Sequence, residues 1–326
     1  MAHYLLTGAG FSYNWGGWLA SEAFEYLLGA PEIDADLRTL LWQNKEAGGG
    51  FEDALAILEK DYADHPGPLT KARLNLLIAA IVGMLNMMSN SMARRQFEQH
   101  NHMQGSVIEF LLKFEALFTL NQDTLLEQHY AQHVMLRSGN RYQGLEFPGM
   151  MSAGPPPISF GGNQEFTALR FPVADGRFTV SPQHQPYFKL HGSRNYSVGP
   201  TGDRIIIMGG NKAALIPRIP VLQWYKDEFT RRICTAGAKL MVIGYSFSDR
   251  HINDAISAGV DCGLKLFIID PAGVDVIDKR KPTPIKAPDA YVQKIGPAII
   301  GASRRPLTQI FNQDHVEWDK IMRFFA

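Results

Sequence analysis

The chain has 326 residues and a balanced charge, 32 Lys and Arg against 32 Asp and Glu, so no overall positive field would hold it on nucleic acid or on an acidic membrane. Apolar residues make up 45% and charged residues 20%, which excludes a disordered or collagen-like protein and predicts one large folded domain or a core with insertions. The two cysteines, Cys234 and Cys262, exclude a disulfide framework and a four-thiolate zinc site.

The first apolar run, His3 to Leu6, has no basic segment or cleavage site, so it predicts a strand rather than a signal peptide, and a cytoplasmic protein. It turns at Gly8-Ala9-Gly10-Phe11-Ser12, where two glycines let the backbone approach a ligand and the next helix would present N–H groups to a phosphate. Tyr13 replaces the third glycine of a GxGxxG pattern, so a tight turn without a ligand remains an alternative.

Residues 20–114 have helical periodicity, for example from Phe51 to Tyr62, from Leu69 to Met88 and from Val107 to Phe114. They predict a helical layer inserted between the first two strands. The run from Leu74 to Met88 is interrupted by asparagines and is shorter than the roughly 18 residues of a membrane span, so it predicts a buried helix or a self-association surface and no membrane.

The second strand, Ala116 to Leu120, leads into Asn121 and Asp123. An asparagine amide can hold a ribose hydroxyl and an attacking water together, while Asp123 could bind a carboxamide or fix the loop. An Asx turn that caps the next helix is the alternative. His129 and His133, four residues apart, lack an evident third metal ligand and are expected on the surface.

A loop-rich segment, residues 144–184, contains Pro155-Pro156-Pro157 and Gly161-Gly162 and is interpreted as a cap or lid over the core. The next strand, Tyr187 to Leu190, ends at His191. A histidine there can act as a base near neutral pH, although a structural histidine is the alternative.

Two further strands end in polar residues. Leu240 to Ile243 precedes Gly244-Tyr245-Ser246-Phe247-Ser248-Asp249, and Leu264 to Ile269 precedes Asp270. Small hydroxyl groups suit phosphate or ribose oxygens, and an acid in the position of Asp270 can bind ribose hydroxyls. Pro282-Thr283-Pro284 predicts a turn before a C-terminal tail.

Strands interleaved with helices predict an α/β fold with a Rossmann-like, doubly wound parallel sheet and ligands at the carboxyl ends of its strands. The expected organisation is a single domain with a core of residues 1–19, 115–143 and 185–275, a helical insertion of residues 20–114, a cap of residues 144–184 and a tail of residues 276–326.

Together, the motifs GAGFS, TLNQD, KLHGS and GYSFSD resemble the sirtuin family, in its bacterial branch of sirtuin-like NAD hydrolases. The resemblance implies that Asn121, His191 and Asp123 carry out catalysis. It implies that the residues contacting NAD+ are Gly8, Ala9, Gly10, Phe11, Ser12, Thr119, Gly244, Ser246, Asp249 and Asp270.

The chain also departs from the deacetylating sirtuins. It lacks the cysteines of their zinc ribbon, and Gly16-Gly17-Trp18-Leu19 replaces their Gly-Ile-Pro-Asp-Phe-Arg segment, so acyl-lysine binding is in doubt. The resemblance then implies an NAD+ hydrolase that releases nicotinamide and ADP-ribose, with no metal. A sensor that binds NAD+ or ADP-ribose without turnover and a zinc-less deacylase are the alternatives.

Members of this branch are effectors of anti-phage defence that assemble with a HerA-type ATPase or a short Argonaute. The resemblance therefore implies a partner protein of this kind and a homo-oligomer. Because the chain has no P-loop and no nucleic-acid-binding motif, sensing of a target would come from the partner.

Overall fold

The computed structural model describes residues 1–98, 106–137, 139, 141–153, 168–209, 212–278, 290–312 and 314–326. The proline and glycine clusters at 155–157 and 161–162 and the turn expected at 282–284 lie outside these residues.

The core is a seven-stranded sheet in which each neighbouring pair runs parallel. Its order is β11-β10-β9-β1-β2-β6-β3. The strands are β1 (His3–Thr7), β2 (Ala116–Thr119), β3 (Leu145–Glu146), β6 (Gln185–Lys189), β9 (Lys239–Ile243), β10 (Lys265–Ile269) and β11 (Ile299–Ser303). From β1 the chain adds β2 and β6 outward on one side and then returns to add β9, β10 and β11 on the other. This is the Rossmann order, which confirms the expected fold class.

The five apolar runs form strands within one or two residues of the predicted positions, and the sheet centre is fully buried, as the runs require. The segment predicted as a C-terminal tail contributes β11, which pairs with β10. Residues 276–326 therefore complete the sheet.

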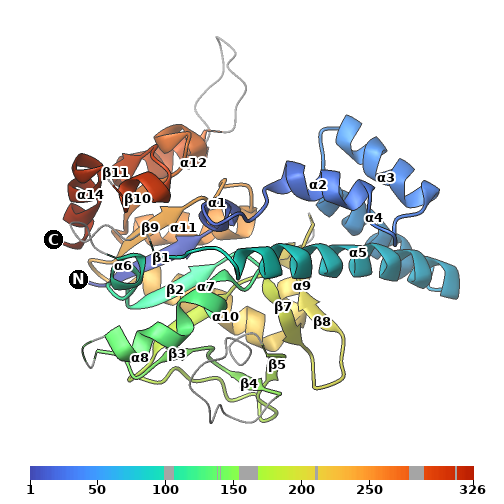
Figure 1. Ribbon diagram of the computed structural model, residues 1–326, viewed down its shortest axis with the longest axis horizontal. Helices are drawn as coiled ribbons and strands as arrows, with labels where there is room; N and C mark the ends of the chain where they lie inside the picture. The colour runs from blue at the N-terminus through green and yellow to red at the C-terminus, as the bar shows by residue number, and fades with distance from the viewer. Residues whose placement is uncertain are drawn as a thin grey trace.

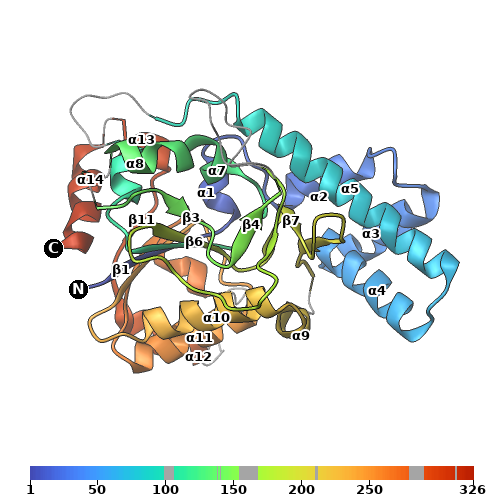
Figure 2. The ribbon, with the colours of Figure 1, turned by 90° about the horizontal axis from the view of Figure 1, so that it is seen from below.

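Helices cover both faces of the sheet (Figure 2). One face carries α10 (Pro220–Ile233), α11 (Arg250–Asp261) and α12 (Ala290–Ile295), and the other carries α1 (Ala9–Tyr13), α7 (Leu125–His129), α8 (Val134–Arg137) and α13 (Leu307–Ile310). Helix α6 (Val107–Leu111) leads into β2, and α14 (His315–Met322) lies near the C-terminus. The two chain ends lie close together (Figure 1), since the His3 ring contacts the Phe324 ring at 5.4 Å between centroids.

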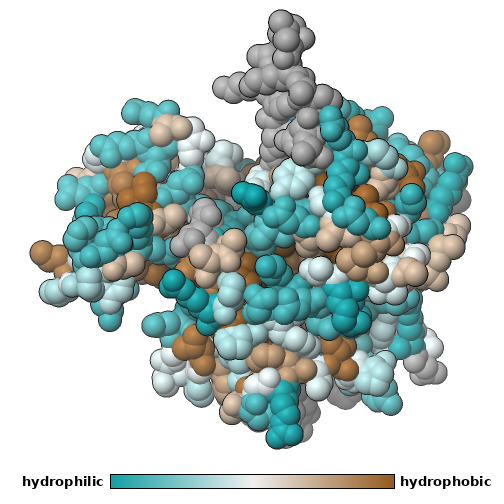
Figure 3. All heavy atoms as spheres, turned by 180° about the vertical axis from the view of Figure 1, so that it is seen from behind, coloured by the Kyte–Doolittle hydropathy of each residue, from teal (hydrophilic) through white to brown (hydrophobic). Residues whose placement is uncertain are grey.

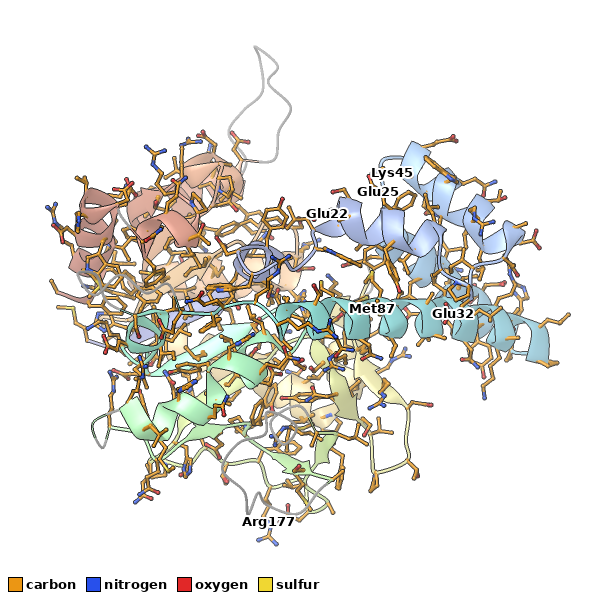
Figure 4. All side chains as sticks on the ribbon, in the orientation of Figure 1. Glu22, Glu25, Glu32, Lys45, Met87 and Arg177 are labelled. Carbon is orange, nitrogen blue, oxygen red and sulfur yellow. The ribbon has the colours of Figure 1, made fainter. Side chains whose placement is uncertain are left out.

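A helical arm extends from the sheet between β1 and β2 (Figure 1). It consists of α2 (Ala20–Leu28), α3 (Ala35–Glu46), α4 (Phe51–Asp64) and α5 (Pro68–Met92), in agreement with the predicted helices. The Lys45 ammonium of α3 lies 5.2 Å from the centre of the Phe24 ring of α2 (Figure 4), which links the two helices.

Helix α5 has the length and apolar composition of a membrane span. Its inner face is part of the core, where Leu77 and Ile81 are almost fully buried, and its outer face carries Met87, which is 57% exposed (Figure 4). This pattern is typical of a core helix with one solvent face.

A second, four-stranded sheet of order β4-β5-β7-β8 packs beside the first. Its strands are β4 (Met150–Ser152), β5 (Arg170–Pro172), β7 (Gly192–Ser197) and β8 (Arg204–Ile206), and the short helix α9 (Lys212–Leu215) follows. The cap segment thus contributes strands as well as loops, and part of residues 185–275 belongs to this second sheet. The surface in Figure 3 mixes hydrophilic residues with small, separate apolar patches.

Candidate functional site

The point at which the sheet order reverses lies between β1 and β9, and the turns after these two strands touch through their backbones. Gly8 N donates to Ile243 O and Gly10 N to Gly244 O, each at 3.0 Å. A Cβ on Gly10 would lie 2.7 Å from Gly244 Cα, and Gly244 has a φ of 63°. The glycines are therefore required by this contact, which agrees with the tight-turn interpretation.

The first helix has fewer free N–H groups for binding a phosphate than its motif predicts. Helix α1 has five residues, and the N–H groups of Gly10 and Phe11 already have backbone acceptors. The Phe11 side chain is 2% exposed and packs on Trp15, with ring centroids 5.1 Å apart, so it belongs to the core rather than to a ligand site.

Three predicted site residues form one hydrogen-bonded chain at the ends of β1 and β2. Asn121 Nδ2 donates to Ser12 Oγ at 2.9 Å and to Gly8 O at 3.0 Å. Ser12 Oγ donates to Asp123 Oδ2 at 2.8 Å, and Asp123 Oδ1 accepts from Leu125 N at 2.9 Å. The amide, hydroxyl and carboxylate thus fix one another's positions.

Thr119 supports this chain from below and is 1% exposed. Its hydroxyl accepts from Thr7 Oγ1 at 2.8 Å and from Asn121 N at 3.0 Å. It orients Asn121 and does not itself reach the surface.

His191 lies at the end of the neighbouring strand. Thr119 of β2 is paired with Lys189 of β6, so Asn121 and His191 both follow the paired residues by two positions on strands about 4.8 Å apart. Gln122 Nε2 also donates to His191 O at 3.3 Å. The register therefore places the ends of the two strands side by side.

A buried ion pair lies beneath the two strand ends. Lys189 Nζ and Glu127 Oε1 are 2.6 Å apart, both side chains are fully buried, and Lys189 also donates to Asp123 O. Burial raises the pKa of Glu127, while the neighbouring lysine opposes the rise. The pair fixes the loop that carries Asp123.

His191 is 3% exposed and contacts a residue that the sequence did not identify, His251 at the start of α11. The two Nε2 atoms are 3.0 Å apart. Burial and the nearby Lys212 ammonium lower the pKa of His191 to about 3, although Asp249 acts in the opposite direction. The imidazole is therefore neutral at physiological pH.

Asp249, predicted to bind the cofactor, is ion-paired. Lys212 Nζ lies 2.8 Å from Asp249 Oδ1 and 3.1 Å from Glu52 Oε2 of the helical arm. Burial would raise the pKa of Asp249, but the ion pair and hydrogen bond with Lys212 act in the opposite direction and the pKa is lowered. One lysine thus joins the arm to the loop beside His191.

The loop from Gly244 to Asp249 is held in a strained form. Phe247 has a φ of 52°, the one positive value found for a non-glycine residue in the described chain. Asn253 Nδ2 donates to Phe247 O at 2.8 Å, and Tyr245 OH donates to Asn253 Oδ1 at 2.9 Å. Asn253, one helical turn after Asp249, therefore holds the loop.

Two further predicted residues, Ser246 and Asp270, make other hydrogen bonds. Ser246 is exposed and its hydroxyl bonds to Ser248, while Asp270 Oδ1 accepts from Ala272 N at 2.8 Å in a turn of its own. His129, considered as a metal ligand, bonds to Met92 O and stacks on Phe97.

Sequence reasoning missed His251, Lys212, Glu52 and Gln122. His251 gave a usable signal, because it follows Asp249 by two residues just after a strand end. Lys212 and Glu52 gave none, because they come together only through the packing of the arm. Two surface hollows lie elsewhere, along α3 and beside β3 and β5. Because His191 is 3% exposed, a ligand can touch its ring only after neighbouring residues move.

No protein-family model matches the chain, and no curated protein matches it. Among solved structures, a Sir2 homologue in complex with NAD is similar over 99% of this chain and 90% of that chain, at 12% identity and a TM-score of 0.42. A mutant Sir2 homologue in complex with 2'-O-acetyl ADP ribose is similar over 98% and 92%, at 14% identity and a TM-score of 0.41. Sir2Tm bound to a propionylated peptide is similar over 98% and 93%, at 13% identity and a TM-score of 0.41.

Proposed function

We propose that this chain is a sirtuin-like NAD+ hydrolase that releases nicotinamide and ADP-ribose. The order of the four strand-end motifs supports the proposal. The observation that carries it is the hydrogen-bonded chain of Asn121, Ser12 and Asp123 beside the register-matched end of β6, where His191 lies. These groups lie next to the reversal point of the sheet, where nucleotides bind in folds of this order.

Release of nicotinamide needs little or no help from a general acid. The nicotinamide ring of NAD+ is a cationic pyridinium and leaves as a neutral molecule, so the positive charge passes to the ribosyl group. The barrier therefore lies in the oxocarbenium-like ribosyl group and in the placement of water. Both Nδ2 hydrogen bonds of Asn121 are made within the protein. No hydrogen bond reaches its Oδ1 from the described residues, so this oxygen is available to a water or to a ribose hydroxyl.

His191 is proposed as the base toward that water or toward a ribose hydroxyl. Its neutral ring can accept a proton, and its low pKa means that the protonated ring exists only briefly before it passes the proton on. Asp123 orients Ser12 and, through it, Asn121. Because His191 is 3% exposed, binding of NAD+ requires neighbouring residues to move before the ring touches the sugar.

The resemblance also supports a wider proposal, an effector in the cytoplasm that depletes NAD+ during anti-phage defence. The activating partner would be a HerA-type ATPase or a short Argonaute, and the chain would act as a homo-oligomer. No metal is part of this reaction.

A second candidate is a sensor that binds NAD+ or ADP-ribose without turnover. The burial of His191, at 3% exposed, favours it, because a binding module needs no access to that ring. The third reading, a zinc-less deacylase, would require an acetyl-lysine peptide to stimulate NAD+ consumption.

The test is the replacement Asn121→Ala in the full chain, assayed for free nicotinamide with and without the product of the neighbouring gene. Loss of the amide should lower release by about 100-fold or more, because it removes the group that places the water. Asn75→Ala, on the exposed side of α5, is the matched control and should keep wild-type release.

Thermal melts of both variants check that the fold is intact. Normal release by Asn121→Ala would refute the assignment of Asn121. Absence of release by the wild-type chain in both conditions, together with measurable binding of ADP-ribose, would favour the sensor.

A further inference from the structure

Three side chains that could bind a metal ion meet at the end of β6 and the start of α11. One donor atom from each of His191, Asp249 and His251 lies within 4.8 Å of the others. His191 is 3% and His251 8% exposed, so the two rings are held by packing rather than by solvent. This is a two-histidine, one-carboxylate set, which suits a divalent transition metal.

The distance between the two rings fits a shared ion. The His191 and His251 Nε2 atoms are 3.0 Å apart. Two nitrogens that each bond one ion at about 2.1 Å lie roughly 3.0 Å apart at a right angle and roughly 3.4 Å apart at the tetrahedral angle. The rings therefore need little movement to become neighbouring ligands, whereas the carboxylate has to approach further.

The carboxylate and the local charge also suit a cation. Lys212 donates to Oδ1 of Asp249, and no hydrogen bond to Oδ2 comes from the described residues, so this oxygen can turn to the ion. Lys212 is shared with Glu52, so two carboxylates face one ammonium and the group carries a net negative charge.

We propose that His191, His251 and Asp249 form a binding site for Zn2+ or a similar divalent transition-metal ion, and that the bound ion inhibits the protein by occupying the ring nitrogen of His191. The site differs from the expectation of no metal drawn from the sequence, because His251 was not identified there. The inhibition rests on the proposed function, whereas the binding of the ion does not.

The binding test uses the full chain with Cys234→Ser and Cys262→Ser, because free thiols also bind zinc. After treatment with a chelator, titration with Zn2+ alone is followed by calorimetry. The expected result is one ion per chain, with affinity lowered by about 100-fold or more in His251→Ala and in His191→Ala through loss of a ligand. His133→Ala is the matched control and should bind as the parent does.

Melting curves confirm the fold of each variant, and Zn2+ should raise the melting temperature of the parent but not of His251→Ala. Absence of binding by the parent would show that the two rings only share a hydrogen bond and would overturn the proposal. Equal binding by His251→Ala would place the ion elsewhere and overturn it as well.

Nicotinamide release then tests the inhibition. Zn2+ should suppress release by the parent, and chelator should restore it. Binding without suppression would refute the inhibitory role. Binding by a chain that never releases nicotinamide would leave the metal site standing and remove the proposed function, so the two failures are distinguishable.

Discussion

At the scale of single residues, the close contact between the turns after β1 and β9 requires glycine in these turns. Backbone flexibility alone does not explain the requirement. A Cβ on Gly244 would lie 2.4 Å from Gly10 C, and Gly244 also has a φ of 63°. A Cβ on Gly48, with a φ of 85°, would meet no atom within 4 Å. The two positions share the left-handed backbone and differ in the space around them.

We therefore expect Gly48→Ala to cost about 1 kcal/mol of unfolding free energy, from backbone strain alone. Gly244→Ala should cost about 3 kcal/mol more, because the turns must separate to admit the methyl group. Urea unfolding of the two variants measures the difference. Equal losses would show that the turns can separate freely.

The site residues divide by the kind of information that reveals them. The positions of Asn121 and His191 at strand ends could be predicted, because each residue directly follows an apolar run. The structural roles of Thr119 and Phe11 could not, because a hydroxyl or a ring at a motif position is equally compatible with packing and with ligand contact. Only the burial of their side chains separates the two.

At the scale of elements, the link between the arm and the core rests on Lys212 of α9. Its side chain is 13% exposed and contacts Asp249 at 2.8 Å and Glu52 of α4 at 3.1 Å. Replacement by methionine leaves Asp249 without its cation. No local pattern of residues predicts this contact, which joins positions 52 and 212, 160 residues apart in the chain.

Lys212→Met should therefore lower the free energy of unfolding by about 1 to 3 kcal/mol, since it leaves a mostly buried carboxylate uncompensated. Lys60→Met serves as the control, because the Lys60 side chain is 77% exposed and pairs with Asp64 on the surface of α4. The control should leave the melting temperature unchanged. An equal effect of the two replacements would show that Lys212 contributes no more than a surface charge.

Strands could be predicted where they are fully buried and continuously apolar, as in β9 and β10. β11 was missed because its sequence, Ile299 to Ser303, contains a glycine and small residues and has a half-exposed pattern. β7 was missed because its GSRNYS sequence is polar. Its buried serines and asparagine have hydrogen-bond partners within the protein; for example, Ser193 Oγ donates to Asn195 Oδ1 at 2.6 Å. Composition does not reveal such pairs.

At the scale of the whole molecule, the sheet needs the last part of the chain. β11 covers the edge of β10, and Phe324 is 1% exposed against the ring of Phe267, with centroids 6.1 Å apart. The sequence predicted the doubly wound class but not the strand that closes this side, since the order of strands depends on pairing between distant segments.

A chain that ends after Asp278 should consequently fail to fold into a monodisperse form, because the β10 edge and several aromatic side chains of the core would be exposed. Size-exclusion chromatography and circular dichroism measure this. Val316→Ala, at a residue 77% exposed on α14, is the control and should behave as the full chain does. A stable, folded truncated chain would show that the C-terminal segment is an accessory.

The contact between the rings of His3 and Phe324 has a practical consequence. His3 begins β1, so both termini leave the molecule at the amino edge of the parallel sheet, opposite the edge that carries Asn121 and His191. Affinity tags, fluorescent proteins or surface anchors attached at either end would therefore point away from the edge that carries Asn121 and His191. A short linker between the two ends would also allow circular permutation, with new termini opened in a surface turn of the arm.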